Sequence, residues 1–124
     1  MSELRGVIVS HAAVAESLVA AVKAITGIDD ALVPVSNDGC DYDALERKLA
    51  AVLDRPAVLF IDLPGGSCLT GAVRYARGRP DIAVVTGVNL AMLLDFVFHR
   101  GLAPAEAARR AADAGGRAIK VTAA

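Results

Sequence analysis

Residues 6–22 read GVIVSHAAVAESLVAAV, and this stretch decides the expected fold. Gly6 to Ser10 form an apolar run suited to a buried strand, and the alanine-rich segment from Val14 has the apolar spacing of a helix. His11 stands between them. A strand that passes directly into a helix is the start of a β-α unit, and ligands of such folds bind beyond the strand ends. The segment therefore predicts an α/β fold with an imidazole at a strand tip.

The rest of the chain repeats this alternation of strand-like and helical segments. We expect further strands at residues 31–36, 57–62 and 82–85, and helices at residues 14–27, 41–54, 68–76, 90–99 and 105–114. Gly115-Gly116 is expected to end the last helix, and residues 117–121 (RAIKV) are expected to form a short final strand. This rhythm is typical of a doubly wound open sheet.

The predicted order of the parallel strands is 2-1-3-4. Pro34 lacks the N–H that an interior strand needs, so its strand is placed at an edge. The run at residues 57–62 is apolar on both faces until Asp62, as expected of a central strand. Right-handed crossovers then make the first and third strands neighbours. Because neighbouring strands lie about 4.8 Å apart, His11 and Asp62 at their carboxyl ends are close enough to touch.

Size and charge limit the classes of function. The 124 residues are expected to form one domain, residues 1–124. Thirteen basic and fourteen acidic side chains give a net charge of -1, which argues against a nucleic-acid partner. The first residues lack the apolar core of a signal peptide, and polar residues interrupt the apolar stretch from Ile82 to Phe98, so we expect a cytoplasmic protein without direct membrane insertion. Cys40 and Cys68 lack CxxC spacing, and neither a metal site nor a cofactor is predicted.

His11 and Asp62 together suit a phosphohistidine intermediate. A carboxylate bonded to one ring nitrogen fixes the tautomer that leaves the other nitrogen nucleophilic. Gly65, Gly66 and Ser67 offer backbone N–H groups and a hydroxyl at a helix start, where an anion is favoured. The structural alternatives are a capping or core-edge histidine, an aspartate that caps the next turn, and glycines that serve only a turn.

Other candidate residues have weaker signals. Thr86, Gly87 and Asn89 are placed as a second wall of the crevice, although they equally suit a strand-to-helix turn. His99 is explained by the dipole at a helix end, and Cys68 is expected to be a small buried cysteine rather than a nucleophile.

Three motifs resemble the mannose-type enzyme IIA domain of the bacterial phosphotransferase system. They are VIVSH at residues 7–11, FIDLPGGS at residues 60–67 and TGVNLAMLLDFV at residues 86–97, in order along nearly the whole chain. The resemblance implies that His11 is phosphorylated, that Asp62 bonds its ring, and that residues 65–67 and 86–92 flank the phosphate.

The same resemblance implies partners. A phosphoryl group would come from the histidine-containing phosphocarrier protein HPr and pass to an enzyme IIB. It also implies a homodimer in which the last strand, near Ala118 to Val121, pairs as an antiparallel edge.

The chain departs from the family pattern beside the site. Cys68, Leu69 and Thr70 stand where the family usually has proline, an aromatic residue and asparagine, and Ala91 replaces a usual proline. These changes affect the rim that partners would touch rather than the histidine and the aspartate. They therefore bear more on partner choice and sugar transport than on phosphorylation.

The predicted function is that of a phosphotransferase, a kinase-type phosphocarrier for sugar uptake or for regulation. One alternative is a regulatory or anion-binding module of the same fold, without transport. Another is a signalling receiver phosphorylated on Asp62, whose layout with Thr86 and Lys120 is similar. Receivers need an acidic pair after the first strand to hold Mg²⁺, and this chain has Ser10 and His11 there.

Overall fold

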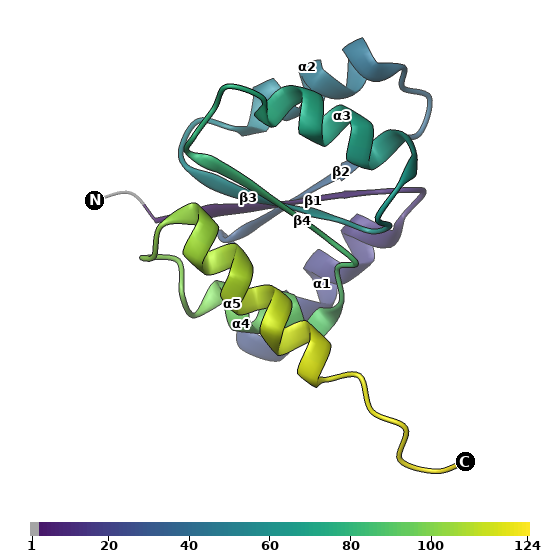
Figure 1. The fold of residues 1–124 in the computed structure, drawn as a ribbon, viewed down its shortest axis with the longest axis vertical. Helices are drawn as coiled ribbons and strands as arrows, with labels where there is room; N and C mark the ends of the chain where they lie inside the picture. Colours follow the sequence, from purple (N-terminus) through teal and green to yellow (C-terminus); the bar gives the residue numbers. More distant parts are fainter. Residues whose placement is uncertain (1–2) are drawn as a thin grey trace.

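The computed structural model describes residues 3–124, which form a four-stranded sheet with helices on both faces (Figure 1). The strands are β1 (Arg5–Ser10), β2 (Leu32–Ser36), β3 (Ala57–Ile61) and β4 (Ile82–Thr86). Their order is β2-β1-β3-β4, and all three pairings are parallel. The predicted order of the parallel strands is confirmed, and Pro34 lies on an edge strand.

Within residues 3–124, five helices complete the two outer layers. They are α1 (Val14–Thr26), α2 (Tyr42–Val52), α3 (Gly66–Ala76), α4 (Leu90–Val97) and α5 (Pro104–Arg117). In Figure 1, α2 and α3 cover one face of the sheet, and α1, α4 and α5 cover the other. Helices on both faces are what right-handed crossovers between parallel strands produce. No helix within residues 3–124 has the length and apolar character needed to cross a bilayer.

Alternate side chains of the central strands point into two separate cores. Val7 and Val9 of β1 pack beneath α2 and α3, with Leu59 and Ile61 of β3. Ile8 joins the opposite core, where the rings of Phe60 and Phe96 meet edge to face at 5.1 Å between centroids. Every residue of β3 is buried. The carboxyl ends of β1 and β3 are therefore held by packing on both sides.

The predicted antiparallel final strand is wrong. Within the described chain, residues 118–124 belong to no strand, and α5 continues through Gly115-Gly116 to Arg117. Gly115 is buried, and a Cβ there would overlap Met92, so this glycine allows α5 to approach α4 instead of ending the helix. Ile119 and Val121 are 76% and 85% exposed, with no strand beside them to supply the ladder of hydrogen bonds that a β-strand requires.

Candidate functional site

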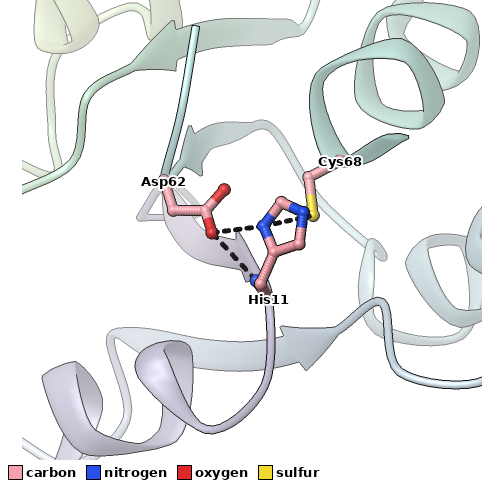
Figure 2. Close-up of side chains that lie close together, drawn as sticks. All are labelled: His11, Asp62 and Cys68. Atoms are coloured by element: carbon pink, nitrogen blue, oxygen red, sulfur yellow. Dashed lines mark hydrogen bonds and ion pairs between the residues drawn. The ribbon is translucent and has the colours of Figure 1, made fainter. Parts of the chain in front are cut away.

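Two neighbouring strands present His11 and Asp62 at one edge of the sheet. β1 ends at Ser10 and β3 ends at Ile61, and the pairing of Val9 with Ile61 brings the residues that follow both strands to the same edge. The ring atom Nδ1 of His11 lies 2.7 Å from Oδ2 of Asp62, and the backbone N–H of His11 donates to the same oxygen at 2.9 Å (Figure 2). One carboxylate oxygen therefore positions both the main chain and the ring of His11.

The backbone after His11 is tightly specified. Ser10 is buried, and its hydroxyl accepts the N–H of Ala15 at 2.7 Å, which ties β1 to the first turn of α1. Ala12 has a φ of 48°, in the left-handed region that residues other than glycine rarely adopt. Its N–H donates to Oδ1 of Asp38 at 3.3 Å. A strained backbone next to a candidate catalytic side chain is typical of functional sites.

The environment of Asp62 favours its charged form. Burial raises the pKa of Asp62, but the hydrogen bonds from the N–H and ring of His11 outweigh it, and the pKa lies below the ordinary value of 3.8. The side chain of Asp62 is 13% exposed, whereas that of His11 is 46% exposed. With Asp62 ionised, Nδ1 of His11 is the ring atom that carries a proton, and Nε2 keeps its lone pair.

Asp62 also caps the turn that follows it. Its second oxygen, Oδ1, accepts the N–H of Leu63 at 2.9 Å. The two interpretations of this aspartate, as a turn cap and as a partner of His11, are thus compatible because they use different oxygens. In this way the bond to Leu63 fixes the carboxylate that orients the imidazole.

The glycine-rich loop that follows Asp62 leads into the first turn of α3. Gly66 has a φ of 84°, which a side chain would strain, and it is the first residue of α3. The first N–H groups of a helix have no acceptor within the helix and carry partial positive charge. The start of α3 is therefore a suitable neighbour for an anion on His11.

The loop after β2 is a part of the site that the sequence interpretation missed. Asn37 donates from Nδ2 to the hydroxyl of Ser67 at 2.8 Å, and Asp38 accepts from Ala12. The N–H of Asn37 also donates to the carbonyl of Ser10 at 3.0 Å. The strand order alone could have indicated this loop, because the carboxyl end of β2 lies at the same sheet edge as that of β1.

Thr86, Gly87 and Asn89, at the end of β4 and in the turn after it, have structural roles. Asn89 caps α4 by accepting the N–H of Met92 at 3.0 Å, and its amide donates to the carbonyl of Gly115 at 3.1 Å. Gly87 has a φ of 76°, as a tight turn requires, and Thr86 pairs with Ile61 at the end of β4. These contacts favour the strand-to-helix turn over a direct part in binding.

Cys68 lies against the imidazole, across the ring from Asp62 (Figure 2). This residue is fully buried, and its Sγ is 3.8 Å from Nδ1 of His11 (Figure 2). Burial, with a smaller contribution from the charge of Asp62, raises the pKa of the Cys68 thiol to about 11. The thiol is therefore neutral at physiological pH and is a poor nucleophile.

The second histidine of the chain has a structural position. Nδ1 of His99 lies 2.7 Å from the carbonyl oxygen of Asp95, one turn earlier. Arg110 of α5 also pairs with the carboxylate of Asp95, at 3.5 Å. His99 thus caps the end of α4, whereas His11 is the histidine whose ring is held at the sheet edge.

Comparison with known families gives one match that spans most of the chain. The family described as PTS system fructose IIA component, EIIA-man, matches residues 6–112. These residues include His11, Asp62 and the glycine-rich loop. No curated protein sequence matches the chain significantly.

Solved structures with the same fold include IIA components of the phosphotransferase system. The mannose/sorbose specific IIA subunit from Enterococcus faecalis is 26% identical, with a TM-score of 0.86, and the match covers 99% of this chain and 97% of that one. The EIIA component from Streptococcus agalactiae is 20% identical, with a TM-score of 0.87, and coverage is 95% and 96%. A IIA protein associated with the fucose utilization operon of Streptococcus pneumoniae is 17% identical, with a TM-score of 0.70, and coverage is 91% and 93%.

Proposed function

The chain belongs to the EIIA-man family of phosphotransferase-system IIA components, and from this premise we propose that it carries a phosphoryl group on Nε2 of His11. Membership assigns a role in phosphoryl transfer within a sugar phosphotransferase system. The observation that supports the residue assignment is the 2.7 Å contact between Nδ1 of His11 and Oδ2 of Asp62. This contact leaves Nε2 as the nucleophilic nitrogen of a half-exposed ring.

The proposed step exchanges one phosphorus–nitrogen bond for another. The lone pair of Nε2 attacks the phosphorus of a phosphohistidine on the donor protein, the donor P–N bond breaks, and the donor imidazole leaves with that electron pair. His11 keeps the proton on Nδ1, so its phosphorylated ring gains positive charge. The carboxylate of Asp62 stabilises this charge through a hydrogen bond already formed in the resting state, which lowers the reorganisation that the step requires.

Backbone dipoles are the proposed stabilisers of the phosphate. His11 precedes α1, and the loop after Asp62 opens α3, so two helix N-termini lie at the edge where Nε2 is placed. Ser67 adds a hydroxyl that Asn37 holds at 2.8 Å. N-terminal N–H groups bind phosphate without a fixed cation. A phosphoryl group held in this way can still be passed to an acceptor.

We propose HPr as the donor and an enzyme IIB as the acceptor, as is expected of a IIA component. The proposed unit is a single IIA domain, residues 1–124, that acts in the cytoplasm and assembles as a homodimer. Light scattering after size-exclusion chromatography measures the mass of the assembly, and so tests the homodimer directly. A mass of one chain at micromolar concentration would contradict the dimer and leave the phosphoryl chemistry unaffected.

The receiver alternative loses support in the structure. A receiver needs its aspartate free to accept a phosphoryl group, but the oxygens of Asp62 accept hydrogen bonds from His11 and Leu63. The other alternative, a regulatory phosphoacceptor that moves no sugar, uses the same chemistry. It differs only in the lack of transfer onward to an enzyme IIB.

The decisive experiment uses the two histidines of the chain as a matched pair. The protein is incubated with phosphoenolpyruvate, enzyme I and HPr, and the mass of the intact chain is measured. We expect a gain of one acid-labile phosphate in the wild type and in His99→Ala, and none in His11→Ala. An undiminished gain in His11→Ala refutes the assignment, and so does the absence of any gain in the wild type.

A further inference from the structure

A second carboxylate lies at the sheet edge that carries His11. Asp38 is in the loop after β2, and its Oδ1 accepts the N–H of Ala12, the residue that follows His11, at 3.3 Å. Phosphoryl transfer as described above uses Asp62 to hold the imidazole and has no step for Asp38. The Asp38 side chain is exposed, and an exposed carboxylate is charged at neutral pH. A negative charge beside a site for an anion calls for a separate explanation.

The loop that carries Asp38 is fixed to both neighbouring parts of the site. The N–H of Asp38 donates to the hydroxyl of Ser36, the last residue of β2, at 3.1 Å. The preceding residue, Asn37, donates from its backbone to the carbonyl of Ser10 at 3.0 Å and from its side chain to Ser67 at 2.8 Å. These contacts tie the loop to the end of β1 and to the first turn of α3, where the phosphate is proposed to lie.

The charge of Asp38 is not neutralised by a neighbouring cation. Within residues 3–124, no lysine or arginine forms an ion pair with it. The ammonium group of Lys48 donates instead to the carbonyl of Ser36 at 2.9 Å. Burial raises the pKa of the Cys68 thiol, and the charges of Asp62 and Asp38 raise it further. The charge of Asp38 therefore acts on the thiol that lies against the imidazole.

At the N-terminus of α1, this carboxylate takes the place of a side-chain cap. Ala13 is the N-cap of α1 and makes no capping hydrogen bond, whereas Asp41 caps α2 by accepting the N–H of Ala44 at 2.7 Å. A negative charge near a helix N-terminus is stabilising. The bond to Asp38 also holds the N–H of Ala12, whose φ of 48° is unfavourable for alanine. In the resting protein, Asp38 thus uses part of the positive potential of α1.

We propose that Asp38 raises the free energy of the phosphorylated protein and thereby makes His11 a better phosphoryl donor, an inference that rests on the proposed function. The carboxylate repels the negative phosphoryl group, and it already uses N-terminal potential that would stabilise that group. Asp62 differs because its charge is paired with the proton on Nδ1 of His11. Asp38 acts through its charge and through the backbone of Ala12, and it is not itself a catalytic residue.

The test measures the equilibrium of phosphoryl exchange with HPr. Phosphorylated HPr is mixed with the unphosphorylated protein in the absence of enzyme I and phosphoenolpyruvate, and the phosphorylated fraction of each protein is measured at neutral pH. Asp38→Asn keeps an oxygen for the N–H of Ala12 and removes the charge. The matched control, Asp41→Asn, removes the charge of another exposed aspartate of the same loop and keeps the cap of α2, because asparagine is an equally good N-cap residue.

We expect the equilibrium constant for phosphorylation to rise about 3- to 10-fold in Asp38→Asn, as for one charge that acts through largely aqueous surroundings over less than a Debye length. Asp41→Asn should stay within about twofold of the wild type. The difference between Asp38→Asn and the wild type should shrink from about 0.05 M to about 0.5 M salt, because salt screens charges and would not change a purely structural effect. Phosphorylated Asp38→Asn should also return its phosphoryl group to HPr more slowly than the wild type does.

Three results would overturn the role of Asp38. They are an equilibrium constant that is unchanged or lowered in folded Asp38→Asn, a rise that is independent of salt, and an equal rise in Asp41→Asn, which would indicate net charge rather than the position of Asp38. Failure of the proposed function is distinguishable from these results. A wild type that takes no phosphoryl group from HPr, or a gain that persists in His11→Ala, refutes the phosphorylation of His11 and with it the role of Asp38.

Discussion

Replacement of Asp62 by asparagine tests the central contact of the site. The carboxylate accepts three hydrogen bonds, two on Oδ2 from His11 and one on Oδ1 from Leu63. An asparagine side chain has the same shape, but one of its two polar atoms becomes a donor. At least one N–H group then faces another donor, and if the amide NH₂ turns toward Nδ1 it selects the tautomer with the proton on Nε2.

The expected loss follows from the strength of that bond. A hydrogen bond to a charged group contributes about 1.5–3 kcal/mol, whereas a neutral one contributes about 0.5–1.5 kcal/mol. The difference of about 1–2 kcal/mol corresponds to a rate of phosphoryl acceptance that is about 5- to 30-fold lower. We expect this loss in the rate constant of transfer rather than in the affinity for HPr, because the side chain of Asp62 is 13% exposed and offers little surface to a partner.

Single-turnover transfer from phosphorylated HPr to Asp62→Asn, followed by rapid quench, gives this rate constant. The matched control is Asp54→Asn, which removes an aspartate that is 64% exposed and pairs with Arg5 and Arg55 instead of His11. Circular dichroism and thermal unfolding establish that both variants are folded. A folded Asp62→Asn protein whose transfer rate is within twofold of wild type would refute the role of Asp62 in orienting the ring.

Three further predictions concern stability and the loop after β2. The bonds from His11 outweigh the effect of burial and hold the pKa of Asp62 below 3.8. The contribution of Asp62 to the free energy of unfolding should therefore be complete above pH 3.8 and decline as the pH falls below that value. Urea unfolding of the wild type and Asp62→Asn at several pH values measures this contribution. Asn37→Ala should reduce the free energy of unfolding by about 0.5–1.5 kcal/mol and slow phosphorylation, because it releases the hydroxyl of Ser67; equal rates would show that this hydroxyl is not needed. Gly115→Ala should destabilise the protein by about 1–3 kcal/mol, because the added Cβ overlaps α4. Gly116→Ala should stabilise it by about 0.5–1 kcal/mol, because the added Cβ meets open space. Both are measured by urea unfolding, and equal effects of the two substitutions would contradict the packing argument.

The sequence pattern predicts the sheet well because each strand has a distinct physical signature. Pro34 excludes its strand from the interior, and the run from Ala57 to Ile61 is apolar at every position, as a strand covered on both faces must be. Together with right-handed crossovers, these two facts leave one order for the parallel strands. The same order places His11 next to Asp62, so this pair was accessible from the sequence.

The errors arise where a residue type has two physical uses. A Gly-Gly pair such as Gly115-Gly116 is typical of a helix end, but Gly115 is a contact point between α5 and α4 within the helix. Asn37 and Asp38 have the composition of a turn, and nothing local distinguishes a turn that only reverses the chain from one that supports Ser67 and Ala12. Cys68 lies 57 positions from His11, and its contact with the ring depends on the direction of α3, which spacing alone does not specify.

The single oxygen of Asp62 that bonds both the main chain and the ring of His11 has a kinetic consequence. A ring tethered at two points cannot swing from one surface of the protein to another, so on the proposed mechanism Nε2 always faces the same direction. The protein that delivers the phosphate and the protein that removes it must then dock in turn at one shared surface. Steady-state kinetics should accordingly follow a double-displacement pattern, with parallel reciprocal plots and mutual competition between the two partners.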